Sequence, residues 1–181
     1  DEKVLFRALN GMLAHDIRIL KVEKAPRSFH SQFSAISKEY HYYLCLDPIV
    51  LPFNRRFRSH IKGPLDLELL KKAAKHFVGT KDFYSYSNSP DKGACSKNSI
   101  RTIHRLDIVA TSDGVRLEFE GNGFLYKMVR NIVGMLLDVA SKKRPIEDIE
   151  KVFLGKDRRL ASKAAPSMGL FLVHITYEES R

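Results

Sequence analysis

The sequence has no tryptophan and only two cysteines, Cys45 and Cys95, which lie in unrelated surroundings. Two such cysteines support neither a disulfide framework nor a Cys-x-x-Cys metal or redox site, so a reducing compartment is expected. None of the seven histidines lies four residues from another, the spacing that places two imidazoles on one helix face for zinc. We therefore expect no metal site.

The sequence also lacks a long apolar run and two familiar catalytic signatures. A membrane span requires about 18 to 20 consecutive apolar residues, and the opening Asp-Glu-Lys is unlike the basic-then-apolar start of a signal peptide. We therefore expect no membrane association and a cytoplasmic protein. The Gly-Asn-Gly at residues 121–123 is too short for a phosphate-binding loop, and no Gly-x-Ser-x-Gly occurs. Nucleotide-dependent catalysis and covalent hydrolase chemistry therefore have no support.

The sequence is rich in positive charge and has a sizeable apolar fraction. Its 181 residues are 44% apolar and 29% charged, which is enough to form a hydrophobic core. Since no repeat or convincing boundary occurs, we expect a single domain over residues 1–181. The 31 Lys and Arg against 21 Asp and Glu give a net charge of +10, which attracts polyanions such as nucleic acids, although many proteins are basic only for solubility.

Hydrophobic periodicity predicts helices and antiparallel strands without a regular βα repeat. The expected helices cover residues 7–13, 66–78, 124–139 and 146–154, and the expected strands cover residues 16–23, 34–46, 101–110, 115–120 and 170–177. Asp66 is the expected N-cap of the second helix, Asp113-Gly114 supplies a tight hairpin turn, and residues 85–99 are expected to form a loop. The pattern indicates an α+β fold, with an antiparallel or mixed sheet and helices packed on one face.

Aromatic and imidazole side chains cluster in residues 29–42. His30, Phe33 and Tyr40 stand close to basic residues there. Rings of this kind stack on unpaired bases, at about 1 to 3 kcal/mol per base. Alternating aromatic residues on a strand also pack against a core and its rim, so the residues alone leave both interpretations open.

The predicted helix over residues 124–139 carries an arginine among apolar residues. Arg130 lies two positions after Met128 and two before Ile132. A buried guanidinium costs several kcal/mol unless a carboxylate or phosphate pairs with it, so Arg130 requires an anionic partner. An intramolecular salt bridge, or an arginine that reaches water at the helix edge, would also satisfy it.

Six short blocks lie in order along nearly the whole chain. They are Arg7-Ala8-Leu9-Asn10, FHSQFSAISKEYHYY (29–43), GTKDFYSY (79–86), GFLYKMVRNIVG (123–134), KDRRLA (156–161) and APSMGLFLVHITY (165–177). Together, and above all through Met-Val-Arg-Asn-Ile-Val-Gly, they resemble the tRNA pseudouridine synthase A family.

The resemblance implies an enzyme that isomerises uridine to pseudouridine in the anticodon arm of tRNA, without a cofactor or a metal. Family members act as homodimers around an antiparallel-sheet catalytic core, so a homodimer is expected of the intact protein. Their nucleophile is an aspartate in a Gly-Arg-Thr-Asp-x-Gly-Val motif. The target uridine must leave its stack to reach that aspartate, at a cost of a few kcal/mol.

The aspartate motif is missing from this sequence. The only Arg-Thr pair, Arg101-Thr102, is followed by Ile103. In the family the motif precedes the Ala-Leu-Asn segment, close to which this chain starts. We therefore expect the C-terminal part of a synthase, inactive alone, whose nucleophile lies in the missing portion. A natural short homologue that kept the fold and lost the chemistry is the alternative.

The resemblance also implies roles for five residues. Tyr40 matches the active-site tyrosine that lies against the target uracil. Arg130 matches the arginine expected to pair with the nucleophilic carboxylate and keep it ionised, which would supply its anionic partner. The further candidates for substrate binding are His30, Phe33 and Lys127.

Three functions remain to be weighed. A synthase core predicts that Tyr40 and Arg130 line one cleft. A non-catalytic RNA-binding module of the same fold predicts salt-dependent tRNA binding that does not depend on Tyr40. Its contacts would come from the basic loops, at Arg55, Arg56, Arg58, Lys92 and Lys97. An α+β interaction domain with incidental positive charge is the third possibility.

Overall fold

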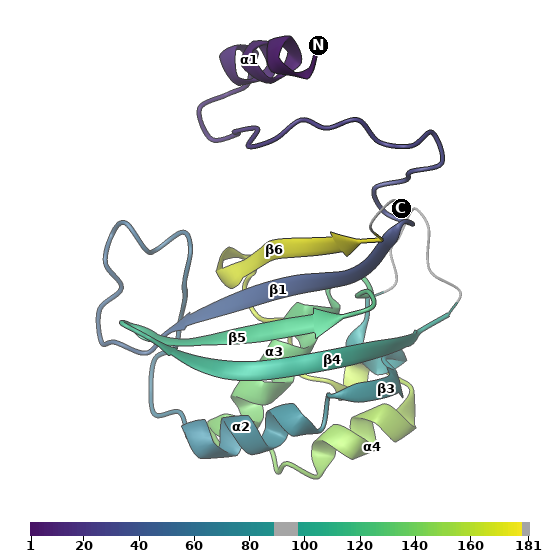
Figure 1. Cartoon of the computed structure of the whole chain (residues 1–181). Coiled ribbons are helices and arrows are strands. Elements are labelled where there is room, and N and C mark those ends of the chain that lie inside the picture. The colour runs from purple at the N-terminus through teal and green to yellow at the C-terminus, as the bar shows by residue number, and fades with distance from the viewer. Residues whose placement is uncertain (89–97, 179–181) are drawn as a thin grey trace. The chain divides into compact units, whose positions relative to one another are not determined.

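The computed structural model describes residues 1–88 and 98–178. The chain forms two compact units, one of Asp1–Ser34 with Glu178–Arg181 and one of Ala35–Tyr177, and each is described by itself (Figure 1). A single domain over residues 1–181 stays a prediction. Most of the predicted loop over residues 85–99 lies outside the described residues. Within the described ranges, no helix has both the length and the apolar character needed to cross a membrane.

The first unit contains one helix and an extended segment. Helix α1 (Glu2–Met12) begins at Asp1, whose carboxylate accepts a hydrogen bond from the Lys3 amide at 2.8 Å, and it confirms the predicted helix with an earlier start. The strand predicted over residues 16–23 is wrong. The side-chain amide of Asn10 bonds both the N–H and the C=O of Ile19 at 2.9 Å, so it takes the partners that a neighbouring strand would use.

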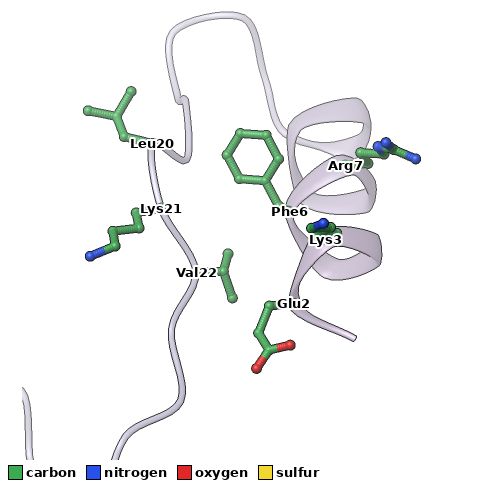
Figure 2. A pocket seen from close by; sticks show the side chains of 7 residues that line it. All are labelled: Glu2, Lys3, Phe6, Arg7, Leu20, Lys21 and Val22. Atoms are coloured by element: carbon green, nitrogen blue, oxygen red, sulfur yellow. The ribbon is translucent and has the colours of Figure 1, made fainter.

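The segment after α1 shares a pocket with the helix. Leu20 and Val22 line a pocket with Phe6 of α1, and Figure 2 shows these residues on the two sides of it. Leu20 nevertheless remains 90% exposed, so this contact with α1 is slight.

A six-stranded sheet organises the second unit, with strand order β2-β1-β5-β4-β3 and β6 paired with β1 (Figure 1). Its strands are β1 (Ala35–Cys45), β2 (Ser59–His60), β3 (Gly79–Asp82), β4 (Ile100–Thr111), β5 (Gly114–Gly121) and β6 (Leu170–Tyr177). Among the strand pairs of the described residues, only the short β1–β2 pair is parallel. The predicted strands of this unit are confirmed, and so is the hairpin turn, where Thr111 pairs with Gly114. The sheet is mixed, one of the two arrangements that the predicted fold class allows.

One face of the sheet is buried. Tyr42 and Leu44 of β1 lie opposite Leu117 and Val115 of β5, and all four side chains are buried. Tyr40 extends the same row opposite Phe119 and is half-buried at its end. This row sets the direction in which the candidate tyrosine points.

Three helices pack on one side of the sheet: α2 (Leu67–Lys75), α3 (Met128–Ala140) and α4 (Asp148–Gly155) (Figure 1). The Asp66 carboxylate caps α2 through the Leu69 amide at 2.9 Å, as predicted. Helix α3 is the central, most buried helix, and it begins at Met128 instead of the predicted Phe124, because Lys127 adopts a left-handed backbone with φ 59°. The α+β class is confirmed. Single 3₁₀ turns occur at Tyr84–Tyr86, Arg158–Leu160 and Ser167–Gly169.

Candidate active site

Arg130 is fixed to the segment that leads into β6. Its Nε donates a hydrogen bond to the Ala165 carbonyl at 2.7 Å, and its own carbonyl accepts one from the Ala165 amide at 2.9 Å. The side chain is half-buried in the first turns of α3. In the described part of the second unit, no carboxylate lies within ion-pair distance of the guanidinium. Its two terminal nitrogens therefore remain available to an anion from elsewhere.

Two tyrosines of β1 face the same side as α3. The Tyr42 hydroxyl donates to the Pro166 carbonyl at 2.7 Å, one residue from the partner of Arg130. Burial raises the pKa of Tyr42, and the nearby positive charge of Arg130 partly opposes that shift. The ring of Tyr40 meets Phe124 edge-on, with centroids 5.1 Å apart. That Tyr40 and Arg130 line one cleft stays a prediction.

Tyr40 is held as a neutral phenol. Burial raises its pKa above the ordinary value of 10.0, so the hydroxyl keeps its proton at neutral pH. Among the described residues, the hydroxyl has no hydrogen-bond partner. The site therefore offers a hydroxyl that can donate to a bound group.

Lys127 stands at the junction before α3. Its left-handed backbone is uncommon for a residue other than glycine, and its carbonyl accepts a hydrogen bond from the Asn131 amide at 3.0 Å. The ammonium group lies 5.2 Å from the centroid of the Tyr126 ring. No carboxylate of the described residues pairs with it. Its predicted role in substrate binding stays a prediction.

His30 and Phe33 belong to the first unit. The His30 Nδ1 accepts hydrogen bonds from the amides of Gln32 at 3.2 Å and Phe33 at 3.3 Å, which leaves the proton on Nε2. The ring centroids of the two residues are 4.4 Å apart, and the Phe33 residue is 78% exposed. Their predicted contact with substrate stays a prediction.

A buried polar cluster beside Arg130 was not predicted. The side-chain amide of Asn131 is fully buried and donates to the Tyr86 carbonyl at 2.7 Å and to Asn88 Oδ1 at 3.0 Å. Its Oδ1 accepts from Arg158 at 2.8 Å. These bonds fix the start of α3 from two sides. A polar residue next to Arg130 in an apolar helix was the only sign of this cluster in the sequence.

The basic residues of the alternative hypothesis fall into two classes. Arg58 is engaged, because its Nε bonds Asp113 at 3.2 Å and its guanidinium lies 4.2 Å from the Tyr43 ring centroid. Arg55 and Arg56 are exposed and form no ion pair within the described ranges. Lys92 and Lys97 lie outside the described residues.

Comparisons of the sequence with known proteins identify the family. The sequence profile described as tRNA pseudouridine synthase matches residues 73–178, which contain α3 and Arg130. The tRNA pseudouridine synthase A 1 of Protochlamydia amoebophila is 56% identical over 171 residues, which cover 94% of this chain and 67% of that protein. The chain belongs to the tRNA pseudouridine synthase family. The residues matched by the family profile include both Arg130 and Ala165.

Other relatives give the same family at lower identity. The tRNA pseudouridine synthase A of Limosilactobacillus reuteri (strain DSM 20016) is 43% identical over 175 residues, which cover 94% of this chain and 66% of that protein. The protein of that name from Chlamydia trachomatis serovar L2b is 42% identical over 177 residues, which cover 98% of this chain and 65% of that protein. This member of the tRNA pseudouridine synthase family thus spans about two thirds of the length of these relatives.

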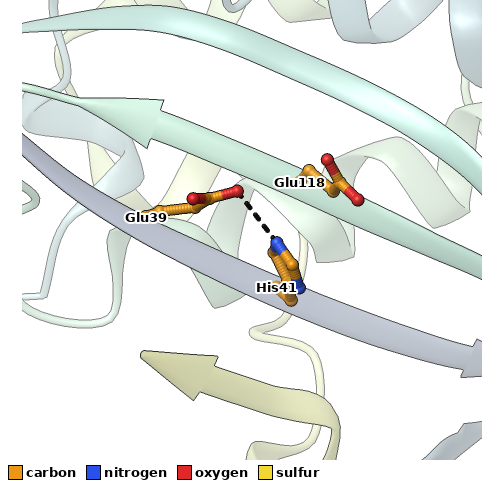
Figure 3. A group of neighbouring side chains, drawn as sticks. All are labelled: Glu39, His41 and Glu118. Carbon is orange, nitrogen blue, oxygen red and sulfur yellow. Dashed lines mark hydrogen bonds and ion pairs between the residues drawn. The ribbon is translucent and has the colours of Figure 1, made fainter. Parts of the chain in front are cut away.

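The opposite face of the sheet carries a charged cluster in this family member. Glu39, His41 and Glu118 place one ligand atom each within 4.8 Å of one another, an arrangement that could hold a metal ion (Figure 3). However, Glu118 accepts hydrogen bonds from both Arg105 and Arg116, and Glu39 accepts from Arg105 at 2.9 Å and from His41 at 3.0 Å. The carboxylates are thus neutralised by arginines, which favours an ion-pair network over a metal centre.

This network shifts the pKa values of its members. The hydrogen bond from His41, together with that from Arg105, holds the pKa of Glu39 below its ordinary value of 4.5. Burial opposes the ionisation of Glu118, but hydrogen bonds from Arg105 and Arg116 outweigh it and lower the pKa. Both carboxylates therefore stabilise the fold at neutral pH, and this contribution is lost as the pH falls through their lowered folded-state pKa values.

Replacing Arg105 with Met is expected to lower the free energy of unfolding at pH 7 by about 1–2 kcal/mol. The change removes one cationic partner from both Glu39 and Glu118, which keep only His41 and Arg116, but Arg105 is one-third exposed, so water moderates the cost. The loss should shrink at pH 4, where carboxylates that have lost a cationic partner bind protons more readily. Urea unfolding at the two pH values measures it, with Arg159→Met, a 90% exposed side chain paired with Asp157, as the control. Equal losses at both pH values would contradict this account.

Proposed function

We propose that this chain is the larger part of a tRNA pseudouridine synthase, which isomerises uridine to pseudouridine in the anticodon stem-loop. In this proposal Arg130 pairs with a nucleophilic aspartate supplied from outside the 181 residues, and Tyr40 lies against the target uracil. His30, Phe33 and Lys127 contact the substrate. The family membership and the names of the relatives support this function.

The half-buried guanidinium of Arg130 is the observation that carries the proposal. Its Nε donates a hydrogen bond to the Ala165 carbonyl, which holds the side chain in one orientation. The two terminal nitrogens remain available to an anion. Two parallel N–H groups match a carboxylate in bidentate geometry, and they favour the ionised form that a nucleophile needs. An RNA-binding module would have no need of this arrangement.

We further propose that the intact protein is a cytoplasmic homodimer that acts on tRNA. The net charge of +10 favours a polyanionic substrate. A binding module without catalysis, the alternative function, would retain affinity for tRNA and show no isomerisation under any condition.

Tritium release from unmodified tRNA labelled at C5 of uridine tests the proposal. Isomerisation replaces the C5–H bond with the C5–C1′ bond, so each turnover releases the label into water. The chain should be inactive alone and active when mixed with the part of the Protochlamydia amoebophila relative that it does not match. Activity of the chain alone would show that one of its own carboxylates is the nucleophile. Tight tRNA binding without activity in the mixture would favour the binding module.

Replacing Tyr40 with Phe is expected to lower the turnover of the mixture by about 10- to 100-fold, because the neutral hydroxyl no longer donates to the bound group. The unfolding temperature should stay unchanged, since that hydroxyl bonds no described residue. Tyr42→Phe is the matched control. It removes the hydroxyl that bonds Pro166, so it should cost about 1 kcal/mol of stability and much less activity. The reverse pattern would assign the active-site role to Tyr42.

A further inference from the structure

The loop between β1 and β2, residues 46–58, exposes apolar side chains that the active site does not use. Ile49, Leu51 and Phe53 are all exposed, and Phe53 is 90% exposed. Arg55 and Arg56 follow directly, also exposed and without an ion pair among the described residues. Several exposed apolar side chains beside two arginines that lack an ion pair are typical of an interaction surface.

The loop has a defined shape. The amides of Asn54 and Arg55 both donate to the Leu51 carbonyl, at 2.9 Å and 3.1 Å. Asp113, at the tip of the β4–β5 hairpin, accepts hydrogen bonds from Arg58 at 3.2 Å and from Asn54 at 3.5 Å. Figure 1 shows the loop projecting at the same end of the sheet as that tip. Because the loop is held in place before it binds, little ordering entropy is lost on contact with a partner.

We propose that the β1–β2 loop is a second RNA-binding surface, in which Phe53 stacks on an unpaired base while Arg55 and Arg56 bind the neighbouring phosphates. The inference rests on the proposed tRNA substrate and adds a contact outside the active site. An aromatic ring supplies the stacking platform and the arginines supply the charge, which is the usual combination for unpaired nucleic acid.

Charge favours RNA over a second copy of this chain. A symmetric contact through this loop would bring together the unpaired arginines of two copies, each of net charge +10. Phosphates, by contrast, neutralise both guanidinium groups. Arg58 differs from its neighbours, because Asp113 and the Tyr43 ring already engage it, so it positions the loop instead of binding RNA.

The surface is remote from the candidate active site. Tyr40 lies five residues before the end of β1 at Cys45, which corresponds to about 17 Å along the strand. That distance is about five nucleotides of a stacked strand. The loop should therefore contact a base well separated from the target uridine, and it should affect binding more than turnover.

Anisotropy titrations of a fluorescently labelled, unmodified tRNA transcript with the whole chain test this inference. Phe53→Leu should raise Kd at least about fivefold, whereas Phe53→Trp, which keeps a ring, should stay within about twofold of the wild type. The double variant Arg55→Gln/Arg56→Gln should reduce the slope of log K against log salt by about 1.5. The control Lys71→Gln/Lys151→Gln removes the same charge from lysines that are already paired with Glu68 and Asp148, and it should change the slope less.

Three outcomes would overturn the inference. Equal affinities of Phe53→Leu and Phe53→Trp would show that stacking is absent, and equal slopes of the two double variants would show that only net charge matters. Light scattering that finds Phe53→Leu dissociating a dimer, with unchanged RNA affinity, would assign the loop to contact between copies. The proposed function is tested separately by tritium release, since a chain that binds tRNA independently of this loop can still isomerise uridine.

Discussion

Replacing Arg130 with Ala is expected to lower pseudouridine formation about 10²- to 10³-fold in the mixture that contains the nucleophile. Arg130 lies in the first turns of α3, and its guanidinium is fixed by the bond to Ala165. Within the described part of the second unit, no carboxylate pairs with it. Without it, the incoming aspartate loses a bidentate partner, so its pKa rises and its orientation is lost. The loss is expected in kcat, because the interaction acts on the reacting group.

The stability of the Arg130→Ala variant separates this role from a structural one. The change removes one hydrogen bond to Ala165, which is worth about 1 kcal/mol and a few degrees in the unfolding temperature. Arg105→Met is the reciprocal control, since it costs more stability on the opposite face and should leave kcat largely intact. Added ethylguanidinium should restore part of the activity of Arg130→Ala. Activity that follows stability across both variants would contradict the assigned role.

Local patterns in the sequence predicted most of the second unit. The alternation around Asp113-Gly114 defined the β4–β5 hairpin, because side-chain period and turn chemistry both act over neighbouring residues. The cap at Asp66 was likewise a local feature. The strand predicted over residues 16–23 failed because a strand depends on a partner, and Asn10 supplied the backbone contacts instead.

The candidate site was predicted less completely, since its contacts join distant segments. The sequence showed that Arg130 needs an anion, but the Ala165 carbonyl that orients it lies 35 residues away. Asn131 bonds residues 27 to 45 positions distant, which no periodicity reveals. Glu118 on the polar face of β5 is only 9% exposed, because arginines from two strands cover it.

Gly134→Ala is expected to lower the free energy of unfolding by about 2–3 kcal/mol. A Cβ at this position would lie far inside the contact distance of the Lys163 carbonyl oxygen and 3.1 Å from its carbonyl carbon. Both neighbours are backbone atoms, so α3 and residues 163–165 must separate. Alanine gains about 1 kcal/mol of helix propensity over glycine, which is less than the cost of overpacking together with the strained bonds between Arg130 and Ala165.

The same separation should also reduce activity, because the segment that Gly134 allows to approach, residues 163–165, carries the Ala165 carbonyl that orients Arg130. Gly155→Ala is the matched control. Its Cβ would meet only the side chain of Leu160, which can rotate away, so stability and activity should change little. Thermal unfolding and tritium release on both variants measure the two effects. A higher unfolding temperature for Gly134→Ala would show that α3 and the segment before β6 do not pack this closely, and the fixed orientation of Arg130 would lose its physical basis.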